Sequence, residues 1–241
     1  MCIVAVADRV SARYPFIVAA NRDERHARPS AAADWWHDEG SLLAGRDLEA
    51  GGTWLGVTGS GRFAAVTNIF EGRGDAAMLS RGALVAGFLE STMTPSDYAA
   101  AVEQDGTRYG AFNLILRSND GLQFVSNRNS SMALEPGVHV FSNNAPGLKW
   151  AKTDLLAQAI RRAADHDDPE QHLIATLSGA DARGPLERAA ESLFVVGNDF
   201  GTRCTTVLTI DDAGRARFVE QRFGPDGGST GRSEYVFEIT S

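Results

Sequence analysis

The sequence contains few cysteines and few lysines. Its 241 residues include two cysteines, Cys2 and Cys204, and two lysines, Lys149 and Lys152. The cysteines lie far apart and form no Cys-x-x-Cys pair, so neither a disulfide framework nor a zinc site is predicted. The five histidines also lack the spacing of metal ligands, and the sequence therefore predicts no metal site.

Positive charge and long apolar segments are scarce as well. The formal net charge is −8, and this negative field disfavours phosphate backbones and anionic lipid surfaces, so no nucleic-acid partner is expected. No apolar stretch approaches the roughly 20 residues that a membrane-spanning helix needs. The apolar run at the N-terminus ends at Asp8 and Arg9 and has no basic region before it, unlike a signal peptide. We therefore expect a cytoplasmic protein without a membrane span.

The overall composition is that of an ordinary globular protein. Apolar residues make up 43% and charged residues 22% of the chain, which is enough to build a packed core. The length lies within the range of one large layered domain. Because no repeat, low-complexity tract or linker interrupts the chain, we expect a single domain over residues 1–241.

Apolar runs separated by turn residues predict β-hairpins, and segments with helical spacing lie between them. Strands that are apolar on both faces need covering elements on both sides, so the pattern predicts an α+β fold of antiparallel sheets with helices outside them. The predicted strands flank turns at 8–13, 59–61, 118–121 and 211–214, with further strands at 137–143 and 234–240; the predicted helices cover 79–90, 95–104, 148–164, 169–177 and 185–194.

The first hairpin places Cys2 beside a charged segment. Residues that oppose each other in an antiparallel hairpin have a nearly constant index sum. With a turn centred near residue 11, that sum sets Cys2 opposite Ala20 or Asn21, next to Arg22 and Asp23. Cys2 is therefore expected to lie close to these two charged side chains.

The same reasoning applied to the last hairpin sets Arg203 opposite Arg222. Like charges that face each other on a sheet are unfavourable. Either a one-residue slip turns one arginine to the other face, or both arginines converge on an anionic group, and the sequence leaves both interpretations open.

Cys2 has two interpretations. If Met1 is removed, Cys2 carries both a thiol and a free α-amino group, whose reference pKa of roughly 7.7–8.0 lets it accept the thiol proton near neutral pH. Arg22 would favour the thiolate, and Asp23 could orient the amine. Alternatively, Cys2 is a small core residue, because free cysteine is among the most buried residue types.

Six segments spread along the chain carry a specific resemblance. They are MCIV at 1–4, AANRDERHARP at 19–29, LAGRDLEAGGTWLG at 43–56, VTNIFEGRG at 66–74, FSNNAP at 141–146 and GTRCTTVL at 201–208. Together they resemble the NRDE family, which includes the transport and Golgi organisation protein 2 group. The resemblance implies a four-layer αββα fold of the N-terminal nucleophile hydrolase type, two antiparallel sheets flanked by helices. The closest functional comparison is with choloylglycine hydrolase and penicillin V acylase, amidases with an N-terminal cysteine.

The comparison with these amidases implies roles for several residues. Cys2 matches the nucleophile, and Asp23 resembles the aspartate that supports the amino group. The amidases place an arginine three residues before that aspartate, whereas Ala20 holds this position here and Arg22 directly precedes Asp23. Arg222 matches a late-sheet arginine of the amidases.

Further residues are assigned to the oxyanion and the substrate. Asn68 and Asn143 resemble the residues that polarise the scissile carbonyl, although each ends a predicted strand, where asparagine commonly caps turns. Arg203, Asn144 and Trp54 are predicted to contact substrate, and Trp54 could equally pack in the core.

Two functions remain open at this stage. The first is hydrolysis of a non-peptide amide or related acyl bond through an acyl-enzyme on Cys2, without a cofactor. The second is a non-catalytic ligand-binding or trafficking role on the same scaffold, with haem or an acyl-lipid such as acyl-CoA as the ligand. In both, the partner is a small molecule; the sequence does not predict an oligomeric state.

Overall fold

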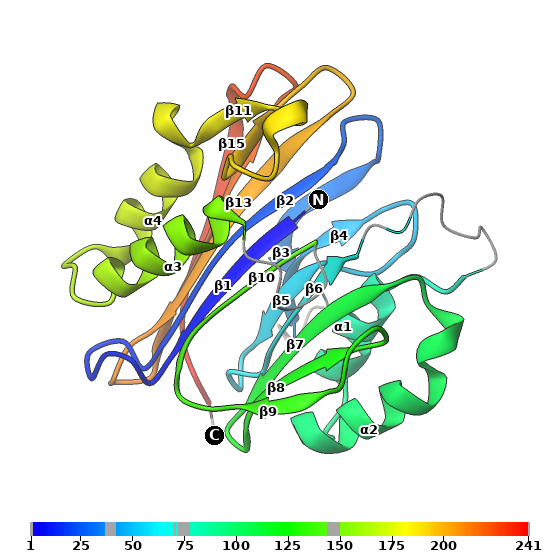
Figure 1. Ribbon diagram of the computed structural model, residues 1–241. Coiled ribbons are helices and arrows are strands. Elements are labelled where there is room, and N and C mark those ends of the chain that lie inside the picture. The colour runs from blue at the N-terminus through cyan, green and yellow to red at the C-terminus, as the bar shows by residue number, and fades with distance from the viewer. Residues whose placement is uncertain (1, 37–41, 70, 72–77, 144–149, 241) are drawn as a thin grey trace. The chain divides into compact units, whose positions relative to one another are not determined.

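The computed structural model describes residues 2–36, 42–69, 71, 78–143 and 150–240. The chain divides into two compact units, each built around one antiparallel sheet with helices (Figure 1). The predicted α+β class with two antiparallel sheets is confirmed, while the prediction of a single domain stays a prediction. The first unit takes in the described parts of Met1–Arg28, Pro136–Ser142 and Gly147–Glu238, and the second those of Pro29–Glu135, Asn143–Pro146 and Ile239–Ser241.

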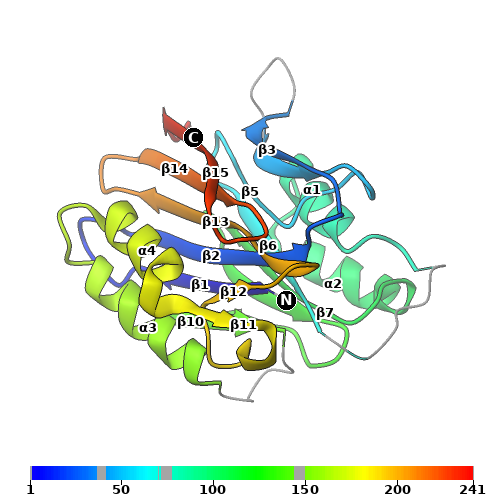
Figure 2. The ribbon, with the colours of Figure 1, turned by 90° about the horizontal axis from the view of Figure 1, so that it is seen from above.

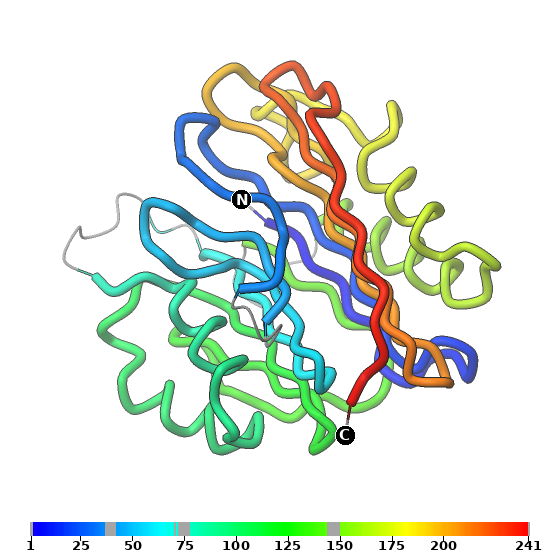
Figure 3. The backbone as a smooth tube through the Cα atoms, turned by 180° about the vertical axis from the view of Figure 1, so that it is seen from behind, coloured from blue at the N-terminus to red at the C-terminus, as the bar shows by residue number. Residues whose placement is uncertain are grey.

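The first unit contains a six-stranded sheet in the order β10-β1-β2-β13-β14-β15. Segments that are distant in sequence lie side by side, as Figure 3 shows for the blue first hairpin and the orange strand β13. The two helices of this unit, α3 and α4, cover one face of the sheet (Figure 2). The strands are β1 (Cys2–Asp8), β2 (Phe16–Arg25), β10 (Gly137–Ser142), β13 (Phe200–Ile210), β14 (Arg215–Phe223) and β15 (Ser229–Glu238); the helices are α3 (Ala151–Ala163) and α4 (Pro169–Ser178).

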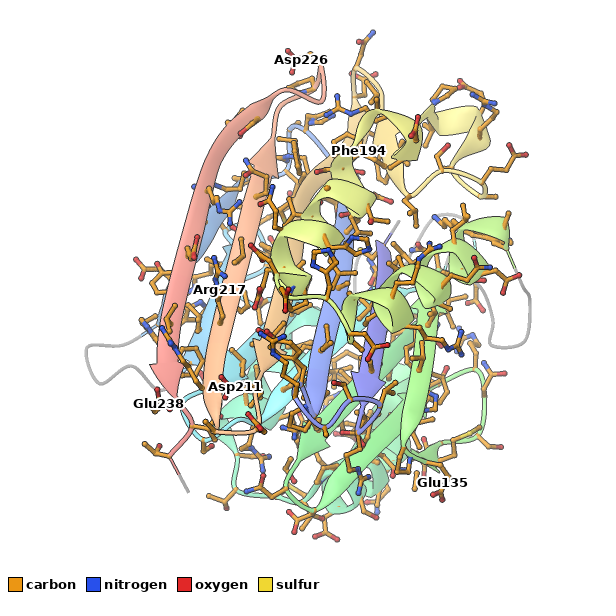
Figure 4. All side chains as sticks on the ribbon, turned by 90° about the vertical axis from the view of Figure 1, so that its left-hand side faces the viewer. Glu135, Phe194, Asp211, Arg217, Asp226 and Glu238 are labelled. Carbon is orange, nitrogen blue, oxygen red and sulfur yellow. The ribbon has the colours of Figure 1, made fainter. Side chains whose placement is uncertain are left out.

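Alternation along the strands creates the core of the first unit. Every second residue of β1, beginning with Ile3, faces the helices, and the buried stripe of α3, which includes Leu156 and Ile160, packs against it. Asp168 caps α4 by accepting a hydrogen bond from the Gln171 N–H at 3.0 Å, which satisfies a backbone donor at the helix start. Figure 4 faces this helical layer and labels Phe194 and Asp211 at opposite ends of the sheet.

The second unit contains a seven-stranded sheet whose order follows the sequence from β3 to β9. Helices α1 and α2 pack on one face of it. The predicted hairpins around residues 59–61 and 118–121 are confirmed, whereas the Ala-rich β3, β4 and the short β9 were not predicted. The elements are β3 (Ser30–Trp35), β4 (Leu42–Asp47), β5 (Leu55–Thr58), β6 (Phe63–Asn68), β7 (Phe112–Ser118), β8 (Gly121–Ser126), β9 (Met132–Leu134), α1 (Gly82–Glu90), α2 (Pro95–Asp105) and a 3₁₀ turn at Gly106–Arg108.

A close backbone contact joins the segment before β5 to α1. A Cβ atom on Gly52 would lie 2.4 Å from the carbonyl carbon of Gly82, the first residue of that helix. Real Cβ atoms do not approach other atoms this closely, so the contact requires glycine at position 52.

The helix predicted over residues 185–194 is wrong. This part of the chain contains a 3₁₀ turn, Leu186–Arg188, between two short strands that pair in parallel. Leu186 is exposed, whereas Phe194 is fully buried against Phe223, so the apolar residues do not form one buried helical stripe. The strands are β11 (Arg183–Pro185) and β12 (Phe194–Val196), and a further 3₁₀ turn covers Ala180–Ala182.

No helix in the described part of the chain combines the length and apolar character that crossing a membrane requires.

Candidate active site

Cys2 is the first residue of β1 and opposes Arg22 of β2. The predicted partners, Ala20 or Asn21, are wrong because the hairpin turn is centred one residue later than expected. Asp8 still belongs to β1 and opposes Phe16. The register therefore brings Cys2 directly beside a charged side chain, which was predicted as a near neighbour.

A row of four side chains crosses the sheet at this level. Cys2 opposes Arg22, Arg22 opposes Cys204 of β13, and Cys204 opposes Arg222 of β14. Directly opposed residues of an antiparallel sheet share a face. The prediction that Arg203 opposes Arg222 is wrong, because the β13–β14 hairpin pairs one residue away from the predicted register along its whole length. Arg203 itself lies at a register shift between β13 and β2.

The two arginines thus have separate surroundings. Arg203 donates through Nη1 to the backbone carbonyls of Arg25, His26 and Arg28, at 3.0 to 3.2 Å, and so fastens the chain that leaves β2. Its predicted contact with substrate stays a prediction.

The Arg222 side chain bonds to residues of its own strand, β14, and of the edge strand β15. It donates to the Ser233 hydroxyl at 2.7 Å and to the buried Glu220 carboxylate at 3.3 Å. Three strand spacings of about 4.8 Å separate it from Cys2. Its predicted catalytic role stays a prediction.

Asp23 is held by a short hydrogen-bond chain on the helix-covered face. The Thr202 hydroxyl donates to Asp23 Oδ1 at 2.7 Å and accepts from the Val195 N–H of β12 at 2.9 Å. Asp23 is 2% exposed, and this burial raises the pKa of its carboxyl group, against the opposing effects of the amino terminus, Lys152, the Thr202 hydrogen bond and Arg22. The Asp23 carboxyl group is thus fixed in position, and its burial disfavours the ionised form.

The Cys2 thiol has opposing influences. Burial raises its pKa most, and the charge of Asp23 raises it further; the positive amino terminus, Arg22 and a backbone hydrogen bond from Asp23 lower it. Cys2 is nevertheless only half-buried, whereas Cys204 is buried and the pKa of its thiol lies well above the ordinary value. Of the two cysteines, Cys2 is therefore the accessible one.

Lys152 is a site residue that the sequence analysis missed. It lies in the first turn of α3, is fully buried, and its charge interacts with those of Asp23 and Cys2. Burial lowers the pKa of its ammonium group, and the two acidic groups oppose this shift. The signal available in the sequence was its rarity, since it is one of two lysines.

The predicted oxyanion residues belong to the second unit. Asn68 ends β6, and Asn143 follows Ser142, the last residue of β10. The Asn143 side-chain amide donates to the backbone carbonyl of Asn68 at 2.7 Å, so these two residues are brought together. Their role as oxyanion donors stays a prediction.

Two further residues, Trp54 and Asn144, were predicted to contact substrate. Trp54 is half-buried in the bend before β5, where its carbonyl accepts from the Val66 N–H. Asn144 lies outside the described residues. Over the residues that are described, no group of three or more His, Cys, Asp or Glu side chains could hold a metal ion.

Comparison with known proteins decides the family. The family model described as "Transport and Golgi organisation 2" matches residues 1–225. The chain belongs to the transport and Golgi organisation 2 family. It is 33% identical to the Bos taurus transport and Golgi organization protein 2 homolog and 30% identical to the Homo sapiens homolog, each over 238 residues that cover 86% of either chain. The predicted relationship to this family is therefore confirmed.

The fold of the transport and Golgi organisation 2 family chain is shared with an amidase. An N-acylethanolamine-hydrolyzing acid amidase ortholog from Caenorhabditis elegans aligns with a TM-score of 0.55 at 11% identity, covering 86% of this chain and 92% of that one. An identity this low shows a common fold and not a common activity. The predicted fold of the N-terminal nucleophile hydrolase type is thus confirmed.

Proposed function

We propose that this protein is an N-terminal-cysteine hydrolase that cleaves a non-peptide amide or related acyl bond after removal of Met1. The observation that carries the proposal is the position of Cys2, at the start of β1 and directly opposite Arg22, with buried Asp23 following on the same strand. The fold shared with an acid amidase supports the proposal. The name of that amidase suggests N-acylethanolamines as the first substrates to test.

The mechanism needs a free α-amino group on Cys2. This amine takes the thiol proton while sulfur attacks the carbonyl carbon, which forms a tetrahedral intermediate. The C–N bond then breaks, and the departing amine receives the proton. Water next attacks the thioester, its proton passes to the α-amine, the C–S bond breaks, and the thiol is restored as the acid leaves.

Asp23 orients the α-amine in this mechanism. Its carboxylate is fixed by the hydrogen bond from Thr202 and can accept from the amine, which directs the lone pair toward sulfur. Asn68 and Asn143 would stabilise the oxyanion, and one such donor contributes a factor of about 10²–10³ in rate. Arg22 would favour negative charge on sulfur, as its effect on the thiol pKa supports.

The raised pKa of Cys2 bears on how the thiol would react. A thiol that is protonated at neutral pH is a weak nucleophile on its own. An adjacent base removes this difficulty, because the proton leaves as the bond to carbon forms. The proposed mechanism therefore requires the removal of Met1.

The names of the relatives favour a second candidate function, ligand binding or trafficking without hydrolysis. The relatives are named for transport and Golgi organisation. Of the two ligands considered, acyl-CoA would need an anion site such as the pair Arg203 and Arg222, and this pair is not formed because Cys204 takes the position opposite Arg222. Haem binding would appear as a shift of the Soret band in an absorbance titration.

The proposed function is tested on purified protein by intact mass and by turnover. We expect the mass to lack Met1, and we expect release of the amine from an N-acylethanolamine to be lost in Cys2→Ala and retained in the matched variant Cys204→Ala. A protein that hydrolyses the amide while retaining Met1 would contradict the proposal. So would equal turnover by Cys2→Ala and wild type.

A further inference from the structure

Lys152 occupies a position where a lysine is unfavourable for the fold. It lies in the first turn of α3, where the helix dipole repels positive charge. Its side chain is fully buried, and a buried ammonium group is costly unless it is paired. A leucine or methionine would fill the same space without these costs, so packing does not explain the residue.

The surroundings of the Lys152 ammonium group supply few hydrogen bonds. Over the described residues, Nζ has no hydrogen-bond acceptor. Its direct neighbour of known geometry is the Trp150 ring, whose centroid lies 5.0 Å away. A cation over an aromatic ring recovers part of the lost hydration, but the three N–H donors remain available.

The position of α3 directs this cation toward the proposed site. Helix α3 packs against β1, β2 and β10, and Lys152 extends the buried stripe of α3 by one turn beyond Leu156. Asp23 lies on the same face of the sheet, as its bond to Thr202 and that of Asn21 to the α4 carbonyl of Leu177 show. Of the titratable groups on the elements packed against α3, Asp23 and Cys2 are the ones whose charges act on Lys152.

We propose that Lys152 is a positioning residue for the nucleophile: its buried ammonium group, on the helix-covered face of the sheet, keeps Asp23 ionised. The inference deepens the proposed function and rests on it, because the ionised Asp23 carboxylate orients the α-amine only if the proposed mechanism operates. Lys152 therefore acts through Asp23, which in turn orients the α-amine of Cys2 in the proposed mechanism.

The first test follows the Cys2 thiol without requiring turnover. The rate of alkylation by iodoacetamide is measured against pH on the N-terminal peptide by mass spectrometry, with buried Cys204 as the internal reference. In Lys152→Met we expect the midpoint to move down, because Asp23 then carries less negative charge and this charge raises the pKa of the Cys2 thiol; in Lys152→Arg it should stay near wild type. Arg161→Met, which removes an exposed charge from the same helix, should leave it unchanged. An unshifted midpoint in folded Lys152→Met would overturn the inference.

The second test does not depend on a Lys152 variant that folds. Because the chain has only two lysines, NMR of protein labelled at the lysine ε-carbon gives two signals, which Lys149→Arg assigns. We expect the Lys152 signal to titrate below the ordinary lysine range and to move lower still in Asp23→Asn. A Lys152 pKa that is the same in Asp23→Asn as in wild type would refute the coupling of the two charges. If no amide is hydrolysed but both shifts occur, the proposed function fails and the Lys152 inference stands.

Discussion

The six-stranded sheet of the first unit buries a carboxylate near each of its ends. Where β1 begins, Asp23 accepts a hydrogen bond from Thr202 and interacts with the charge of Lys152. Near the turn between β13 and β14, Glu170 of α4 accepts a hydrogen bond from Thr209 and pairs with Arg217. Arg217 also binds Glu234 at 2.7 Å, and Figure 4 labels it on this part of the sheet.

The two ends differ in how the cation is used. At the Glu170 end, the arginine lies between two carboxylates and donates to both, as expected for an ion-pair chain that supports the fold. At the Asp23 end, the lysine makes no hydrogen bond within the described residues. A buried cation that makes no hydrogen bond acts by its charge alone, which suits the inferred role of Lys152 in keeping Asp23 ionised.

Asp23→Asn should have the largest effect on function. Under the proposed mechanism we expect hydrolysis to fall by about 10²-fold or more, because a neutral amide does not stabilise the positive charge that the α-amine gains when it takes the thiol proton. The same change should lower the pKa of the Cys2 thiol, because the charge of Asp23 raises it. Turnover and thiol alkylation therefore move in opposite directions, which a general loss of structure would not produce. Unchanged turnover would contradict the assigned role.

Glu170→Gln is the matched change at the other end of the sheet. The amide can still accept from Thr209 but loses its pairing with Arg217, so we expect a loss of about 1–3 kcal/mol in the free energy of unfolding. Urea denaturation measures this. Alkylation of Cys2 should not change, and an altered alkylation profile would show that the two ends are coupled.

Much of this fold follows from the sequence because its signals are local. The hairpin turns at residues 59–61 and 211–214 are marked by Gly, Asp and Ser, and the strands beside them contain short apolar runs, such as residues 63–66. The missed elements have weaker signals: β3 is rich in alanine, and β11 and β12 have three residues each. They pair with strands that are near in sequence, so they were missed because the strands themselves are short or rich in alanine.

The candidate site was predictable in part for the same reason. Cys2 and Asp23 are close in sequence and share a hairpin, so their neighbourhood could be inferred, although the register was wrong by one or two residues. Lys152 reaches this region only because α3 packs on β1 and β2, and no local pattern encodes that contact. The bulge at Arg203 likewise depends on the pairing of β13 with β2.

The two ends should also respond oppositely to pH. The raised pKa of Asp23 means that its contribution to stability is present at acid pH and is lost as pH rises through the folded pKa. The lowered pKa of Glu234, caused by the hydrogen bond from Arg217, means that its contribution is lost as pH falls through the folded pKa. Relative to Asp23→Asn, wild type should therefore gain stability on acidification, and relative to Glu234→Gln it should lose stability. Denaturation curves between about pH 3 and pH 7 measure both stability differences. If the two differences changed with pH in the same direction, the expected contrast between the two ends of the sheet would be wrong.

Arg203→Lys should have the smallest effect and decides whether this arginine belongs to the reactive end. One guanidinium nitrogen donates to three carbonyls of the chain that leaves β2, and the nitrogen of a lysine, whose side chain is one atom shorter, does not reach the same position. We expect a loss of about 1 kcal/mol in the free energy of unfolding, with the KM for the amide unchanged. A raised KM at unchanged stability would instead place Arg203 in contact with substrate. The bulge at this position would then serve binding, and the reactive end would extend beyond the cluster of Cys2, Asp23 and Lys152.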